Sequence, residues 1–312
     1  MKRVCRIALL GECMIELRGQ LFGTMQQAFG GDTLNTAVYL SRLCRHRGVQ
    51  VSYATDLGID PFSEAMIRAW EGEGIDTGLI RRQEGLMPGL YTIQVDETGE
   101  RTFYYWRDMS AAKAYFRGVT SPLEEQLADI DALYFSGISL AIFDAAARDR
   151  LFKIVTTLRE RGGKVIFDNN YRTRMWPVTV EARAWYAHAY EMADIAMITL
   201  DDEMALFGIS EEERALERVF NLPTPEVVVK RGALPAIIRL SGQEPSSVPA
   251  CQVAKVVDTT AAGDSFAAGY LAARLTGSSA ELAARSGACL AAAVIQHPGA
   301  IIPLSAMPDN LF

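Results

Sequence analysis

The sequence predicts an α/β protein: a three-layer αβα sandwich with a mostly parallel central sheet and a small β-sheet lid. Three observations predict this class. Short β-rich runs alternate with longer helical patterns, which indicates βαβ units. Expected strands such as 165–167 and 227–229 are continuously apolar, as in sheets covered by helices on both faces. Two stretches, 15–29 and 89–106, break the alternation and are typical of consecutive strands.

The regular elements follow one another in the order that βαβ units require. The first apolar run, 6–11, is too short for a signal peptide and lacks a small-residue cleavage pattern, so it predicts a strand. Helical patterns and strands then alternate. We expect strands at 50–55, 132–135, 164–168, 195–199 and 227–229, and helices at 33–45, 61–73, 144–161, 262–275 and 279–295.

The two irregular stretches predict the lid. The runs 91–95 and 101–106 flank Asp96-Glu-Thr-Gly99, which indicates a hairpin. Inserted hairpins do not easily join a parallel sheet, so we expect a separate small sheet that covers the site. The chain has no repeat, low-complexity tract or linker. We therefore expect a single domain, 1–312, with a lid formed by about 13–29 and 88–118.

Composition excludes several classes of protein. The 312 residues carry a net charge of -7, with 49% hydrophobic and 22% charged residues. This balance is that of an ordinary globular protein and argues against a broadly basic nucleic-acid surface. No uncharged stretch reaches the roughly 18 residues that cross a membrane, so we expect a cytoplasmic protein. Five scattered cysteines without a CxxC pair indicate reduced thiols.

The strongest local signal is the segment 256–266, where an apolar strand is expected to end and a helix to begin after Ala261-Ala-Gly263. Small residues let an anion approach the free backbone amides, and the helix dipole stabilises it there. Asp264 then lies in the first helical turn. It either caps the helix or accepts a hydroxyl proton while the amides hold a phosphoryl group.

A second segment, Phe29-Gly-Gly-Asp-Thr-Leu-Asn35, opens the helical pattern that follows. It is either an ordinary turn and helix start or a place where bare amides and Asn35 bind sugar hydroxyls. The alanine-rich patterns near the C-terminus also have two interpretations. They either pack closely against the sheet or leave a flat slot for a planar ring.

Together these segments resemble the two signatures of the ribokinase-like, or PfkB, family of carbohydrate kinases: Gly30-Gly-Asp-Thr-Leu-Asn35 and Asp258-Thr-Thr-Ala-Ala-Gly-Asp264. The resemblance spans the chain in motif order. It implies a ribokinase-like fold and ATP-dependent phosphorylation of a sugar with Mg²⁺. Within the family, three segments look like those of 2-keto-3-deoxygluconate kinases, which form the 6-phosphate. These segments are the early motif, Tyr104-Tyr-Trp-Arg107 and Phe167-Asp-Asn-Asn-Tyr-Arg172.

Two arginines have the charge that a sugar-acid substrate would require. A sugar acid presents a carboxylate that an arginine binds with two hydrogen bonds, whereas a neutral sugar needs no fixed positive charge. Arg172 follows the strand 164–168 at the carboxyl edge of the sheet, where ligands bind. The alternative is that Arg107 and Arg172 are solvated or structural arginines that bind no carboxylate.

The resemblance implies roles for further residues, and Asp264 would be the base. Thr33 departs from the commonest early motif, Glu16 matches a sugar-binding aspartate only loosely, and the tyrosines have an alternative role as lid core. The sugar acid would contact Gly31, Asn35, Tyr91, Tyr105, Arg107, Arg172 and Asp264.

On the nucleotide side, the resemblance implies an anion hole at Ala261, Ala262 and Gly263. Lys230 and Gly232 would lie near the phosphates and ribose, and Gly287 and Ala291 would flank adenine. Glu203 would help to hold Mg²⁺, although Leu200-Asp-Asp-Glu203 lacks the usual asparagine. Asp258 and Thr260 would form the monovalent-cation site of some members.

Competing classes find little support. The chain has no P-loop, no dinucleotide-binding glycine motif, no protein-kinase motif set and no nucleophile elbow. The remaining alternatives are a kinase of a neutral sugar, such as a fructokinase or ribokinase, and a non-catalytic sugar sensor. The edges of the lid strands predict a homodimer.

Overall fold

The large sheet combines strands from both halves of the chain. In the computed structural model, which describes residues 4–95, 101–309 and 311–312, it has nine strands in the order β13-β12-β11-β10-β9-β8-β1-β4-β5. All pairs are parallel except β11-β12 and β12-β13 at one edge. The strands are β1 (Cys5–Leu10), β4 (Val49–Leu57), β5 (Ile80–Arg82), β8 (Ala132–Ser136), β9 (Lys164–Asp168), β10 (Ile195–Thr199), β11 (Glu226–Arg231), β12 (Leu234–Leu240) and β13 (Ser246–Val248).

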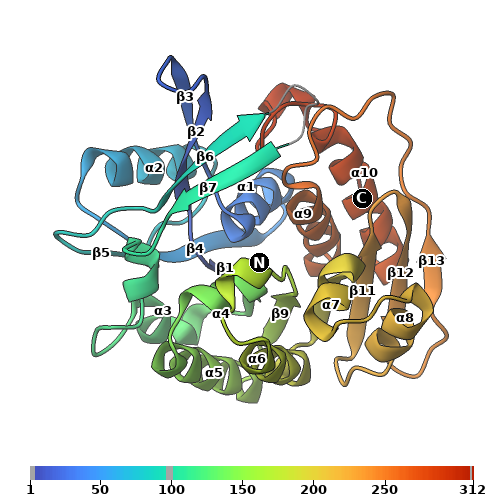
Figure 1. Ribbon diagram of the computed structural model, residues 1–312. Coiled ribbons are helices and arrows are strands. Elements are labelled where there is room, and N and C mark those ends of the chain that lie inside the picture. Colours follow the sequence, from blue (N-terminus) through green and yellow to red (C-terminus); the bar gives the residue numbers. More distant parts are fainter. Residues whose placement is uncertain (1–3, 96–100, 310) are drawn as a thin grey trace.

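Helices cover both faces of this sheet, as Figure 1 shows. One face packs against α1 (Asp32–Cys44), α2 (Pro61–Gly72), α9 (Ala262–Leu275) and α10 (Ala280–Val294). The other packs against α3 (Pro122–Glu125), α4 (Gly137–Ile142), α5 (Ala145–Glu160), α6 (Thr179–Met192), α7 (Leu200–Phe207) and α8 (Glu212–Phe220). Short 3-10 turns lie at Ala111–Ala114, Leu127–Asp129, Thr173–Met175 and Leu304–Ala306. The predicted three-layer sandwich is confirmed.

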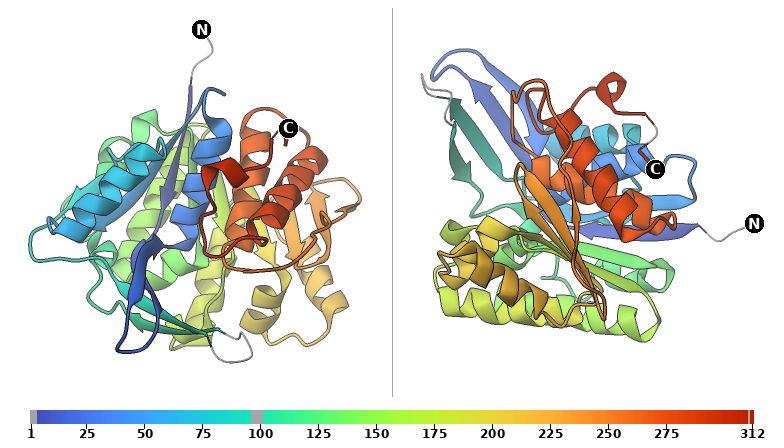
Figure 2. Two further views of the ribbon diagram at one scale, coloured as in Figure 1. Left: turned by 90° about the horizontal axis from the view of Figure 1, so that it is seen from above. Right: turned by 90° about the vertical axis from the view of Figure 1, so that its right-hand side faces the viewer.

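The inserted strands form a second sheet with the order β3-β2-β6-β7, which projects from the sandwich in Figure 2. Its strands are β2 (Met14–Gly19), β3 (Met25–Gly30), β6 (Leu90–Val95) and β7 (Arg101–Trp106). The two hairpins are antiparallel, and β2 joins β6 in parallel. Met14, Tyr91 and Ile93 form its small core. The separate sheet is as predicted, and the turn expected at 96–99 lies outside the described residues.

The strand expected to end at Val256-Val257 is not formed, because no strand lies among the described residues between β13 and α9. Val256 and Val257 are about half exposed, and the amides of Val257 and Asp258 both donate to the carbonyl of Ile295, at 2.8 and 3.1 Å. This segment therefore attaches to the end of α10 instead of the sheet. Among the described helices, none combines the length and apolar character needed to span a bilayer.

Candidate active site

The two sequence motifs meet where two neighbouring helices begin. Gly31 is the N-cap residue of α1, and residues 258–264 lead into α9, which packs against α1. The side-chain amide of Asn35 donates to Oδ2 of Asp264 at 2.8 Å, across a separation of 229 residues. The hydroxyl of Thr36 donates to the carbonyl of Asp264 at 3.3 Å. The fold thus joins the early motif to the late one through a direct hydrogen bond.

The start of α9 offers donors to an anion. Ala261 occupies the N-cap with a left-handed φ of 59° and contributes no side-chain cap. The amide of Ala262 donates to the carbonyl of Thr259 at 3.2 Å, just before the helix. The amide of Gly263 lies in the first turn, where amides have no partner inside the helix. A Cβ atom at Gly263 would lie 3.6 Å from Nζ of Lys230, so the ammonium group lies beside this turn. Backbone amides, helix dipole and ammonium charge all favour a phosphoryl group here.

The surroundings of Asp264 differ from those expected for a helix-capping carboxylate. Its carboxylate bonds to Asn35 on another helix. Burial raises the pKa of Asp264 from 3.8 to about 7, and the negative charges of Asp32 and Asp168 act in the same direction. The Asn35 hydrogen bond and the charge of Lys230 oppose this shift. A carboxylate with a pKa near neutrality can accept a proton at physiological pH and retain it during reaction.

The small sheet supplies the other wall of the site. A Cβ atom at Gly31 would lie 2.0 Å from the carbonyl oxygen of Glu12, so only glycine allows this close approach. The hydroxyl of Tyr91 donates to the buried carboxylate of Glu16, and the ring of Tyr91 lies 5.9 Å from that of Tyr105. Tyr91 is buried and Tyr105 is about half exposed. Tyr105 is therefore the more accessible of the two predicted pocket tyrosines.

The two predicted carboxylate-binding arginines, Arg107 and Arg172, both lie near enough to Tyr105 to influence its charge. The guanidinium of Arg107 pairs with the buried Glu12 and lies 5.7 Å from the centre of the Tyr105 ring. Arg172 bonds to Asp202 at 3.2 Å, with half of its side chain exposed. Burial raises the pKa of Tyr105, and the positive charges of both arginines oppose that shift. Both cations thus act on the same part of the site.

Several buried polar atoms around this wall lack a hydrogen-bond partner among the described residues. They include Oδ1 of Asn35, Oε1 of Glu12 and Nε of Arg107. Buried polar atoms without partners are rare in folded proteins and often mark places where a ligand completes the bonding. The free oxygen of Asn35 lies on the same amide that donates to Asp264. It is available to a sugar hydroxyl.

The predicted nucleotide residues lie at the carboxyl edge of the sheet and on α10. Nζ of Lys230 bonds to both carboxylate oxygens of Asp168, at 2.8 and 3.1 Å. Gly232 has a φ of 60° in the turn after β11. Gly287 is buried against α9, where a Cβ atom would lie 2.6 Å from the carbonyl oxygen of Phe266. Ala291, one turn further on, is partly exposed and is the more accessible of the two predicted adenine contacts.

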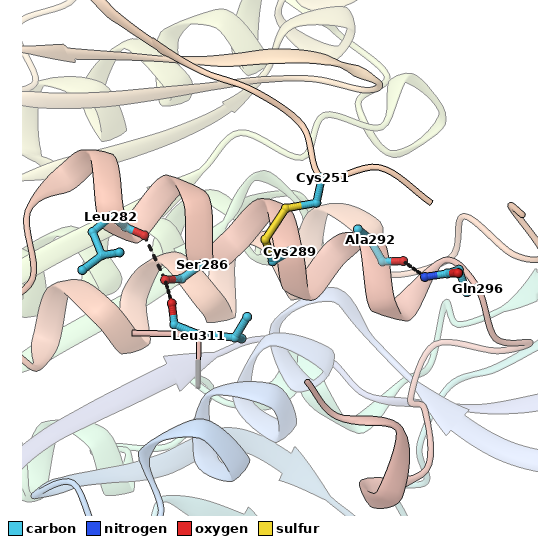
Figure 3. Close-up of a disulfide and its surroundings, with 7 residues drawn as sticks. All are labelled: Cys251, Leu282, Ser286, Cys289, Ala292, Gln296 and Leu311. Atoms are coloured by element: carbon cyan, nitrogen blue, oxygen red, sulfur yellow. Dashed lines mark hydrogen bonds between the residues drawn. A yellow bond between two sulfur atoms is a disulfide. The ribbon is translucent and has the colours of Figure 1, made fainter. Parts of the chain in front are cut away.

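The expectation that all five cysteines are reduced thiols is wrong for two of them. Figure 3 shows Cys251 joined to Cys289 by a disulfide, which ties the segment before α9 to the middle of α10. Cys289 lies between the two predicted adenine contacts in the sequence. Of the remaining cysteines, Cys13 and Cys44 are buried thiols outside this disulfide.

The predicted metal ligand, Glu203, is fully buried. Its carboxylate accepts hydrogen bonds from Tyr190 at 2.6 Å and from Arg218 at 3.1 Å. Burial raises its pKa. The described residues contain no group of three or more acidic, histidine or cysteine side chains that would hold a metal ion.

Sequence reasoning missed four carboxylates. Asp32 and Asp168 stand inside the motifs but were given no role, and Asp202 lies beside Arg172. Asp32 accepts from Asn170 at 2.8 Å, and burial raises its pKa. Glu12 pairs with Arg107. The motif positions of Asp32 and Asp168 were a usable signal, whereas nothing local indicates the pairing of Glu12.

Comparisons with known proteins agree with this geometry. Residues 5–307 match the family described as pfkB family carbohydrate kinase. The chain is 50% identical to the 2-dehydro-3-deoxygluconokinase of Escherichia coli strain K12, covering 97% of this chain and 99% of the relative. It is 49% identical to that of Dickeya dadantii, covering 97% and 98%. An E. coli protein described as a ribokinase II, in complex with ATP and Mg²⁺, has a similar structure, with a TM-score of 0.82, 25% identity and coverage of 97% and 96%.

Proposed function

The chain belongs to the pfkB family of carbohydrate kinases, and from this premise we propose how its residues phosphorylate 2-dehydro-3-deoxygluconate. This sugar acid is the 2-keto-3-deoxygluconate of the sequence comparison. The reaction transfers the γ-phosphoryl group of ATP to the primary hydroxyl and yields the 6-phosphate and ADP. The observation that supports the proposed site most strongly is the 2.8 Å hydrogen bond between Asn35 and Asp264, which joins the two motifs.

Asp264 acts as the base. Its carboxylate accepts the proton of the primary hydroxyl while that oxygen forms a bond to the γ-phosphorus. The bond from the γ-phosphorus to the β,γ-bridging oxygen breaks, and ADP leaves with the electron pair. The amides of Ala261, Ala262 and Gly263 stabilise the charge on the transferring group, since phosphoryl transfer depends mainly on positioning and charge stabilisation.

The sugar acid lies between the small sheet and the start of α1. Gly31 and Asn35 bind its hydroxyls, and Tyr91 and Tyr105 line the pocket. Its carboxylate binds Arg107 and Arg172, which are held in advance by Glu12 and Asp202. Such pairing keeps the guanidinium groups oriented before the substrate arrives.

ATP binds along the carboxyl edge of the sheet. Lys230 and Gly232 lie near the phosphates and ribose, and Gly287 and Ala291 flank adenine. Mg²⁺, when bound, neutralises phosphate charge. Glu203 remains a predicted ligand that would act through water, since Asp168 bonds to Lys230 and Asp202 bonds to Arg172.

A monovalent cation at Asp258 and Thr260 remains part of the proposal. Both side chains offer oxygen ligands, but the guanidinium of Arg101 contacts them in this structure. The cation and Arg101 are therefore alternatives at one position.

We also propose that the small sheet, about 13–29 and 88–118, acts as the lid of a single domain and forms a homodimer contact. The exposed side chains of Tyr104 and Trp106 on its edge strand β7 support an interface. The proposed location is the cytoplasm, where ATP is available.

The pH profile tests the base. We predict that kcat/KM for the sugar acid rises with pH, with a midpoint at about 7, and is level above pH 8. The reason is that Asp264 must be ionised to accept a proton, and burial raises its pKa to about 7. Initial rates of ADP release between about pH 5.5 and 9 measure this profile. A kcat/KM that does not change with pH across that range would show that Asp264 is not the titrating base.

Substrate profiling separates the remaining alternatives. We predict that kcat/KM for 2-dehydro-3-deoxygluconate exceeds that for fructose or ribose by at least about 10²-fold, because neutral sugars leave the arginines without their anion. Coupled measurement of ADP release gives these values. Equal values for fructose would favour a neutral-sugar kinase, and tight binding of the acid without turnover would favour a sensor.

A further inference from the structure

An arginine of the small sheet reaches the turn that precedes α9. Arg101 begins β7, and its guanidinium pairs with the carboxylate of Asp258, 157 residues away. The same nitrogen donates to the hydroxyl of Thr260 at 2.9 Å. The side chain of Asp258 is 1% exposed and that of Arg101 is 25% exposed. An ion pair this well buried is not one of the solvated surface pairs that contribute little.

Asp258 in turn holds the shape of the phosphate-binding turn. Its two carboxylate oxygens accept the amides of Thr260 at 2.8 Å and Gly299 at 2.7 Å. Burial opposes ionisation, but these hydrogen bonds and Arg101 outweigh it and lower the pKa of Asp258. The turn leads directly into Ala261, whose left-handed conformation aims the first amides of α9.

A second arginine of the same sheet approaches the same place. A Cβ atom at Gly299 would lie 3.7 Å from the guanidinium of Arg18, on β2. Arg18 pairs with Glu16 at 3.1 Å, and Glu16 accepts the hydroxyl of Tyr91 in the predicted sugar pocket. The small sheet therefore contacts the turn before α9 through Arg101 on β7, and Arg18 on β2 lies near Gly299, whose amide donates to Asp258.

We propose that Arg101 is a positioning residue that couples binding of the sugar acid under the small sheet to the phosphate-binding turn at 258–263. The inference rests on the proposed function, because it needs both ligands to occupy the assigned sites. With the sugar acid bound, the small sheet holds Arg101 on Asp258, and the amides of α9 are ordered for the γ-phosphate. Sugar acid and nucleotide then strengthen each other's binding, because such coupling is reciprocal.

Calorimetric titration with the β,γ-methylene analogue of ATP, in Mg²⁺, tests this coupling. The dissociation constant is measured with and without saturating 2-dehydro-3-deoxygluconate. In the parent protein we expect the sugar acid to tighten analogue binding by at least about fivefold. In Arg101→Gln we expect that ratio to fall to within about twofold of one, with an intermediate ratio in Arg101→Lys, which keeps the charge but loses the planar fork. Arg101→Lys provides the comparison where Arg101→Gln does not fold.

Lys164→Gln is the matched control, since Lys164 forms an exposed ion pair with Asp194 at the start of β9, the opposite edge of the sheet. It should keep the parent ratio. A purely structural role for Arg101 predicts weaker analogue binding by the same factor with and without sugar acid, and that result overturns the inference. A parent ratio of one also overturns it. A parent protein that does not phosphorylate the sugar acid contradicts the proposed function instead.

Discussion

Asp264→Asn is expected to lower kcat for 2-dehydro-3-deoxygluconate by on the order of 10³-fold, because a well-placed general base contributes about 10² to 10⁴. The amide is nearly the same size and can still accept the hydrogen bond from Asn35. It cannot accept the hydroxyl proton. Steady-state ADP release with the sugar acid and Mg-ATP measures the loss, and KM for ATP should change little.

The same substitution is expected to raise the melting temperature above pH 7. In the parent, burial raises the pKa of Asp264 from 3.8 to about 7, so ionisation destabilises the fold progressively over that interval. The asparagine has no such penalty. The difference in melting temperature should therefore vanish near pH 4 and be fully present above pH 7. Asp149→Asn, the same chemical change on the remote helix α5, should change neither quantity. Parent-like turnover in Asp264→Asn would contradict the assigned role.

Arg172→Gln is expected to lower kcat/KM for the sugar acid by on the order of 10²-fold, which corresponds to about 2–3 kcal/mol for a lost charge-assisted contact. The uncharged amide of the same sugar acid should lose far less, since it presents no carboxylate. Arg172 is preferable to Arg107 here, because half of Arg172 is exposed and its partner Asp202 is partly exposed, whereas the partner of Arg107 is buried. Initial rates with both substrates provide the measurement.

Arg107 needs a paired design. Removing it alone would leave the carboxylate of Glu12 buried and unpaired, which destabilises proteins by about 3–5 kcal/mol and confounds activity with folding. A double variant, Glu12→Gln with Arg107→Gln, removes both charges together. Arg214→Gln, on the exposed pair with Glu211 in α8, is the control for loss of an arginine. For Arg172→Gln, an equal loss of kcat/KM with the sugar acid and with its amide would show that Arg172 does not bind the carboxylate.

The parts of the fold that the sequence predicted are those that local pattern determines. Parallel strands such as β9 and β10 were predicted to the residue, because continuous apolar runs bounded by turns mark buried strands. The site pair Asn35 and Asp264 was predicted because each residue lies in a recognisable segment at a helix start. Local chemistry and family resemblance agreed on both residues.

What the sequence did not predict depends on contacts between distant residues. The Glu12–Arg107 pair spans 95 residues, and the Arg101–Asp258 pair spans 157, so no local periodicity indicates either. The apolar Val256-Val257 was expected to end a strand, but its segment bonds to the end of α10. The disulfide between Cys251 and Cys289 likewise follows from how this segment lies against α10.

The product of the reaction tests the account most directly. Phosphorus NMR of a mixture of protein, Mg-ATP and 2-dehydro-3-deoxygluconate should show ADP and a single new phosphomonoester in equal amounts. Its signal should be split into a triplet by the two protons of the adjacent primary carbon, as expected for the 6-phosphate. A doublet would place the phosphoryl group on a secondary hydroxyl. ADP with inorganic phosphate alone would contradict phosphorylation of the sugar acid by this site.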